Sequence, residues 1–186
     1  KDTNLKLFVV TVLLTGLAYG LYRGVQDNYL AEIVHITEFE RGIVEFFREL
    51  PGLLLIFILA AMYRFSETNV FKVGTAVMLA GVLGLLFTGS SKVVVILFMV
   101  VFSTGEHVVM PIKSSMSLYL AQKDKGGTSL GITSAIGKGG NILGYLVVSI
   151  IFFVFARLGF SRQDTVAFKT VYALAAALLV GSTLVA

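Results

Sequence analysis

The chain has 186 residues, of which 56% are hydrophobic and only 14% are charged. Soluble globular proteins carry roughly 25% charged residues, so the composition argues against a cytosolic enzyme and for an integral membrane protein. There are no Cys and only two His, which excludes disulfides and cysteine nucleophiles, and we expect no metal or cofactor. The net charge of +4 does not indicate nucleic acid, because Lys and Arg gather at the cytoplasmic loops of membrane proteins.

Six segments are apolar and long enough to cross roughly 30 Å of hydrocarbon as helices. They cover residues 5–33, 40–63, 70–90, 93–119, 128–156 and 166–186. The third is the clearest, because residues 73–91 contain no charged residue. The connections between the segments are too short to hold a soluble domain. The sequence therefore predicts an all-α, polytopic membrane protein, with one domain over residues 1–186 that forms a bundle of six transmembrane helices.

The basic residues at the ends of these helices weakly favour a cytoplasmic N-terminus in the cell membrane. Six cations would then be cytoplasmic and four outside: Lys1, Lys6, Arg64, Lys72, Lys123 and Lys125 against Arg41, Lys92, Arg157 and Arg162. The last predicted helix is still apolar at Ala186, and the first residue is not Met. We expect the natural chain to continue.

Polar residues recur at helical spacing along four of the six predicted helices, so that they share one face of each helix. In chain order these faces hold Gly16, Tyr19, Gly20, Arg23, Gln26 and Asp27; Arg41, Glu45, Arg48, Glu49 and Gly52; Ser103, Glu106, His107 and Met110 with Lys113 at the edge; and Gly131, Ser134, Lys138, Asn141 and Tyr145. Helices 70–90 and 166–186 have no such face. We expect the four striped helices to surround a wet interior and the other two to support them from outside.

Ionisable residues inside membrane spans are costly, so each is a candidate functional residue. Four cations balance four carboxylates: Arg23, Arg48, Lys113 and Lys138 against Asp27, Glu45, Glu49 and Glu106. Arg23 and Asp27 can pair at i,i+4. Protonation of a carboxylate would release a cation to hold a substrate. The substrate-binding candidates are Arg23, Gln26, Arg48, Lys138, Asn141 and Tyr145, and the proton-coupling candidates are Asp27, Glu45, Glu49, Glu106 and His107.

Several of these residues also have a purely structural interpretation. Arg23 and Asp27 could form a structural pair within one helix, and His107 could bond a neighbouring helix. Lys113 could extend its ammonium group to the membrane surface. Asn141 and Tyr145 could bridge helices. Lys138 is the stronger functional candidate, since it has no charged partner nearby in the sequence.

The chain resembles the N-terminal six-helix half of a major facilitator superfamily transporter. The similarity lies in the pattern of spans and in the segments EFFRELPG (45–52), Gly105 with Pro111, the turn 123–126 and the Gly-rich run 131–144. The sequence YRFSETNVFKVG (63–74) lacks the Asp-Arg-x-Gly core usual between the second and third helices, and the usual basic residue of the fourth helix is missing. The resemblance implies a second six-helix half, a midplane substrate site and alternating access.

We therefore expect a secondary active transporter, not an enzyme, that moves a small polar or anionic organic solute with protons. Its partners would be the solute, the proton, the lipid bilayer and a second six-helix half, either covalently joined or a second copy. A homodimeric channel or half-transporter is the first alternative. A rhomboid-like serine protease is the second, suggested by Gly-Thr-Ser-Leu-Gly at 127–131, although His35 and His107 both precede Ser129.

Overall fold

The computed structural model describes residues 2–161 and 163–186, so Lys1 and Arg162 lie outside the described residues. It contains helices α1 (Asp2–Glu32), α2 (Glu38–Leu53), α3 (Leu55–Ala61), α4 (Glu67–Phe87), α5 (Lys92–Leu120), α6 (Gly126–Arg157) and α7 (Thr165–Val185). Over the described ranges there is no strand, which confirms the all-α prediction.

Five helices, α1, α4, α5, α6 and α7, are long and apolar enough to cross a membrane. Their ends lie within three residues of the predicted ends. The agreement follows from composition, because an unbroken apolar run of this length has few alternatives to a helix in lipid. The chain is thus an integral membrane protein by length and composition of its helices.

The prediction of a single helix over residues 40–63 was wrong. It is divided into α2 and α3 at Leu54, whose backbone N–H still bonds Leu50 O at 3.1 Å. Pro51 lies inside the last turn of α2, where it supplies no backbone donor, and Gly52 follows it. The two residues weaken the turn before Leu54, which accounts for the break.

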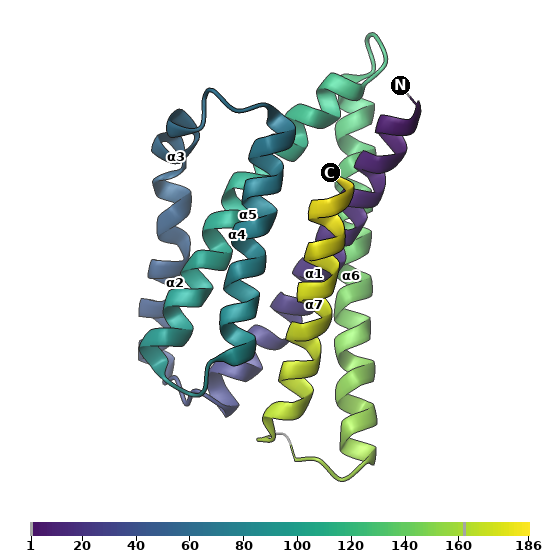
Figure 1. Ribbon diagram of the computed structural model, residues 1–186. Coiled ribbons are helices and arrows are strands. Elements are labelled where there is room, and N and C mark those ends of the chain that lie inside the picture. Colours follow the sequence, from purple (N-terminus) through teal and green to yellow (C-terminus); the bar gives the residue numbers. More distant parts are fainter. Residues whose placement is uncertain (1, 162) are drawn as a thin grey trace.

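The helices lie side by side (Figure 1). Helix α1 packs against α6 on one side and α7 on the other, and α4 packs against α5 and α7. The α2 and α3 pair packs against α5 at one edge of the molecule. Both termini and the α5–α6 connection lie at the same end in Figure 1, which we call the terminal end.

Glycines allow α1 and α6 to approach closely. A Cβ on Gly16 would lie 2.6 Å from Gly137 O, and a Cβ on Gly140 would lie 2.9 Å from Leu13 O. Gly144 meets α1 in the same way, 2.7 Å from Leu17 O. Small residues at this spacing are the usual means by which membrane helices bring their backbones together. This close contact fixes the rotation of α6 relative to α1. It therefore determines which α6 side chains lie at the edge of the α1–α6 contact.

Aromatic side chains fill the centre of the molecule between α1, α5 and α7. The Tyr22 and Phe102 rings stack with centroids 3.7 Å apart, and both side chains are fully buried. Tyr29 packs against Phe168 and Tyr172 of α7, at 5.5 and 5.4 Å. These contacts hold α1 between its neighbours, with Gly16, Tyr19 and Gly20 of its polar face directed toward α6 and the space beside α5.

Candidate functional site

The polar faces of α1, α5 and α6 meet at a cleft of about 170 Å³, which we call the charged cleft. Its polar lining comes from Thr15, Tyr19, Glu106, Lys113, Ser134, Lys138 and Asn141. Val12, Met78, Val109 and Met110 add an apolar wall. A small site with a few convergent polar groups on an apolar wall is typical of pockets for small molecules.

Two lysines lie at the end of the charged cleft nearer the terminal end. The Lys113 ammonium group reaches α6, where it lies 3.6 Å from the position of a Cβ on Gly137. Lys138 is the next residue on α6, and Lys113 and Lys138 repel each other electrostatically. Neither lysine forms an ion pair with any residue that the structure describes. Lys113 therefore points into the cleft rather than to the membrane surface, and the sequence-based site omitted it.

Glu106 lies deeper in the charged cleft, together with Tyr19. The Tyr19 and Glu106 side chains both line this part of the cleft. One Glu106 carboxylate oxygen, Oε2, is buried and has no hydrogen-bond partner in the described chain. Glu106 forms no ion pair there either. Buried polar atoms without partners are unusual in folded proteins, so this oxygen is a place where a ligand group or proton would be stabilised. Tyr19 also was absent from the predicted site residues.

Asn141 lines the charged cleft but is used by the fold. With its amide oriented to satisfy both neighbours, its nitrogen donates to Gly16 O at 2.8 Å and to Gly137 O at 3.0 Å. Tyr145, one turn further along α6, packs against Gly24 and does not line the cleft. Of the predicted substrate residues on α6, Lys138 is the one whose charged group stays available to a ligand.

Arg23 and Gln26 lie on α1 beyond Tyr19, outside the charged cleft. Arg23 Nη1 donates to Gln26 Oε1 at 2.8 Å, and Gln26 is fully buried. The expected Arg23–Asp27 pair was wrong. Asp27 is half exposed and pairs with Arg41 of α2 at 2.6 Å instead. The turn after α1 brings α2 back against the end of α1. The guanidinium group of Arg41 therefore reaches Asp27, whereas that of Arg23, in the same helix as Asp27, bonds Gln26.

The charges of α2 form a second cluster, on the side of α5 that faces α2. Arg48 is mostly buried and pairs with Glu45 and Glu49, each at 2.6 Å. The Glu49 carboxylate also approaches His107 Nε2 at 3.4 Å. Gly52 makes room for this imidazole, since a Cβ there would lie 2.7 Å from Nε2. The structure thus joins His107 to Glu49 rather than to Glu106, its neighbour in sequence.

Ser103 completes this α2–α5 contact. Its hydroxyl donates to Arg48 O at 2.5 Å, and His107 Nδ1 lies 2.9 Å from Ser103 O. Arg48 has two carboxylate partners, whereas the cations of the charged cleft have none in the described residues. The predicted site residues therefore divide into a compensated cluster on α2 and an uncompensated one in the cleft.

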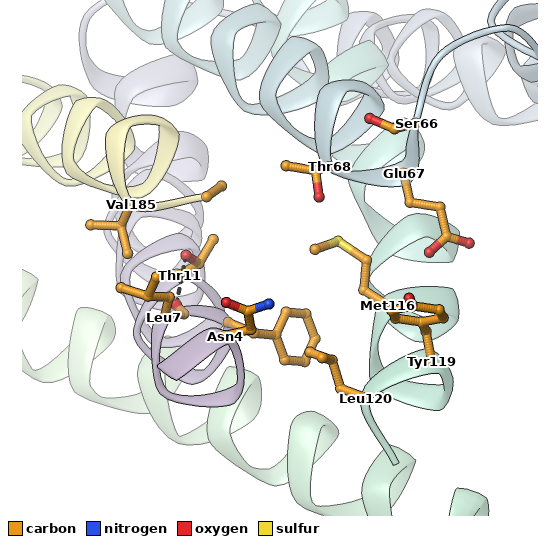
Figure 2. Close-up of a pocket in the computed structure, with 12 residues that line it drawn as sticks. Asn4, Leu7, Thr11, Ser66, Glu67, Thr68, Met116, Tyr119, Leu120 and Val185 are labelled. Carbon is orange, nitrogen blue, oxygen red and sulfur yellow. Dashed lines mark hydrogen bonds between the residues drawn. The ribbon is translucent and has the colours of Figure 1, made fainter. Parts of the chain in front are cut away.

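A larger cleft of about 390 Å³ lies at the terminal end between α1, α4, α5 and α7 (Figure 2). Its polar lining is Asn4, Thr11, Ser66, Glu67, Thr68 and Tyr119. Glu67 already accepts a hydrogen bond from Ser115 of α5, and Thr11 donates to Leu7 O in its own helix at 2.9 Å. Despite its size, this cleft has one ionisable carboxylate and no cation among the described residues, so we take the charged cleft as the candidate site.

Ser129, the serine of the Gly-Thr-Ser-Leu-Gly segment, lies near the start of α6 in a group of hydroxyls. It donates to Ser117 O at 2.8 Å, and the Ser117 hydroxyl contacts Thr133 at 2.8 Å. His107 bonds Ser103 and approaches Glu49, and His35 lies in the turn between α1 and α2. Neither imidazole is a partner of the Ser129 hydroxyl, so this geometry gives no support to a serine–histidine dyad.

No family model matches this chain, and no curated protein matches it in sequence. The assignment of a function therefore depends on the helices and on the two charged clusters.

Proposed function

We propose that this chain is one half of a secondary active transporter that resembles the major facilitator superfamily. It moves a small polar or anionic organic solute, coupled to protons, by alternating access in the cell membrane with its N-terminus cytoplasmic. The observation that carries the proposal is the charged cleft, where Lys113, Lys138 and Glu106 face one another inside apolar helices without ion-pair partners in the described chain. Such groups in a membrane span are expensive to keep unless they are used.

The path of the chain supports six crossings. Helix α1 runs away from the terminal end and α4 starts again near it, so α2 and α3 must cross back between them (Figure 1). Helices α2 and α3 have 16 and 7 residues. At 1.5 Å per residue their combined length is about 35 Å, which is enough to cross the hydrocarbon layer. Within α2, Arg48 is mostly buried between its two carboxylate partners, and Glu49 contacts His107 of α5, as we expect for charges in a spanning segment.

A second half would supply the opposite wall of the charged cleft. Helix α6 exposes much of its length, including Lys138 and Tyr145, while α4 and α7 cover the other side of α1 and α5. The second half is either covalently joined or a second copy. The copy arrangement would place Lys138 and Glu106 twice around the same interior, which is also the arrangement of the homodimeric alternative.

Proton-coupled solute movement tests the proposal. The full-length natural protein is reconstituted into vesicles that contain a pH-sensitive dye, and amino acids, monocarboxylates, dicarboxylates and sugars are added from outside. We expect at least one solute to move protons. Glu106→Gln should slow that movement at least tenfold, whereas Glu38→Gln, at an exposed position at the start of α2, should change it less than twofold. Solute uptake that ignores both the pH gradient and the Glu106 substitution would contradict the proposal.

A further inference from the structure

The charged cleft carries opposite charges at its two ends. Lys113 follows Glu106 by seven residues on α5, which places the two on one face about 10.5 Å apart along the helix axis. Lys138 lies at the level of Lys113, because Lys113 Nζ approaches the adjacent Gly137. Asn141, one turn further along α6, is level with Gly20, close to Tyr19 and Glu106. The cleft therefore has two ammonium groups at one end and a carboxylate with a phenol hydroxyl at the other.

Neither end is neutralised by the part of the protein that the structure describes. Arg48, Arg41 and Lys92 all have carboxylate partners within 2.7 Å. Arg23 and Arg48 act on Glu106 electrostatically, but neither lines the cleft. Glu106 and Lys113 do not pair with each other, although both face the same small space. A space between separated, unpaired charges of opposite sign favours a ligand that carries both signs.

We propose that the charged cleft binds a small zwitterion with a primary ammonium and a carboxylate group, the chemistry of an α-amino acid. The ligand carboxylate lies between Lys113 and Lys138, and its ammonium group faces Glu106 and the Tyr19 hydroxyl oxygen. This inference rests on the proposed function and narrows its substrate class.

Simpler ions match the cleft less well. A monoanion held by the lysines would leave the buried oxygen of Glu106 unpartnered and facing the ligand. An amine held by Glu106 would place a third cation beside the two lysines. The zwitterion compensates both ends, and its side chain can pack on Val12, Val109 and Met110. The cleft volume of about 170 Å³ suits a molecule of this size.

Matched ligands test the inference on the full-length protein purified in detergent, with binding measured by isothermal titration calorimetry. Three series are used: alanine, propionate and ethylamine; leucine, 4-methylpentanoate and 3-methylbutylamine; phenylalanine, 3-phenylpropanoate and 2-phenylethylamine. In at least one series we expect the amino acid to bind at least tenfold more tightly than both its deaminated and its decarboxylated counterparts.

Substitutions separate the two ends. In Glu106→Gln, the amino acid should bind no more tightly than the monoanion, and the monoanion should still bind. A misfolded variant would bind neither ligand. Lys138→Gln should weaken both carboxylate ligands at least tenfold. Lys169→Gln, on the exposed start of α7 outside the charged cleft, should leave all affinities within twofold.

Two outcomes overturn the inference. The first is a monoanion or an amine that binds as tightly as the amino acid in every series, and the second is the absence of binding in all three. Neither decides the proposed function, which has its own readout: proton movement driven by a sugar or a dicarboxylate alone would support transport while excluding the zwitterion. Loss of proton movement for every solute would instead contradict the proposed function itself.

Discussion

At the residue scale, the available space around each side chain decides which polar groups remain free. Lys113 extends to α6, where its ammonium group lies 3.6 Å from the position of a Cβ on Gly137. Asn141 is held by two backbone carbonyls, so its amide contributes to packing. Gln26 accepts a hydrogen bond from Arg23 through Oε1, while its buried Nε2 has no partner among the described residues. The sequence identified Lys138 and Glu106 by their charge in apolar helices. It counted Lys113 among the intramembrane cations but did not assign it to the substrate site, because Gly137, which its ammonium group approaches, is 24 residues away.

Gly140 and Gly139 provide a matched test of the close approach between α1 and α6. A Cβ at Gly140 would lie 2.9 Å from Leu13 O and 3.0 Å from Leu17 N, whereas a Cβ at Gly139 meets nothing within 4 Å. We expect Gly140→Val to destabilise the protein by about 1–3 kcal/mol through overpacking, and Gly139→Val to have little effect. Thermal unfolding of the purified protein, followed by loss of the monomeric elution peak, measures the difference. Equal losses from both substitutions would mean that the α1–α6 contact is absent.

At the element scale, α2 packs mainly on one long helix, α5, whereas each of the five long helices packs on at least two others. Polar contacts hold it there: Ser103 to Arg48 O, and His107 to Glu49. The sequence predicted a charged face for this helix and an unbroken course to residue 63. The face is present, but the break at Leu54 was not foreseen, since Pro and Gly are tolerated within membrane helices and do not by themselves fix a boundary. The Asp27–Arg41 pair could not be predicted either, because helical spacing in a sequence identifies neighbours only within one helix.

Ser103→Ala should loosen α2. The substitution removes the donor to Arg48 O, a hydrogen bond with a net contribution of roughly 1 kcal/mol. We therefore expect the backbone amides of residues 45–53 to exchange hydrogen about fivefold faster, with no change in α1 or α6. Thr104→Ala serves as the control, since the Thr104 hydroxyl bonds Val100 O in its own helix. Hydrogen exchange measured by mass spectrometry that changes everywhere, or only in the control, would show that Ser103 does not position α2.

At the scale of the whole molecule, α1, α5 and α6 enclose the charged cleft, and α4 and α7 pack behind them. The sequence predicted the five long helices well, because hydrocarbon thickness sets their length. It also predicted which helices carry polar faces. It could not predict which charges are paired. Arg48 of α2 is paired with carboxylates of its own helix, whereas the charges of the charged cleft have no ion-pair partners in the described residues. This difference depends on contacts between helices that are distant in sequence.

Water access to the charged cleft tests the central claim, that these polar faces line an aqueous pathway inside the membrane. The chain has no Cys, so single cysteines can be placed cleanly. Ser134 lines the cleft, whereas Ile132, two residues earlier and about 200° around α6, is exposed on the other side. The full-length protein in intact membranes is treated with a membrane-impermeant, negatively charged thiol reagent. We predict that Ser134→Cys is modified and Ile132→Cys is not; equal reactivity, or a reactive Ile132→Cys alone, would contradict the account.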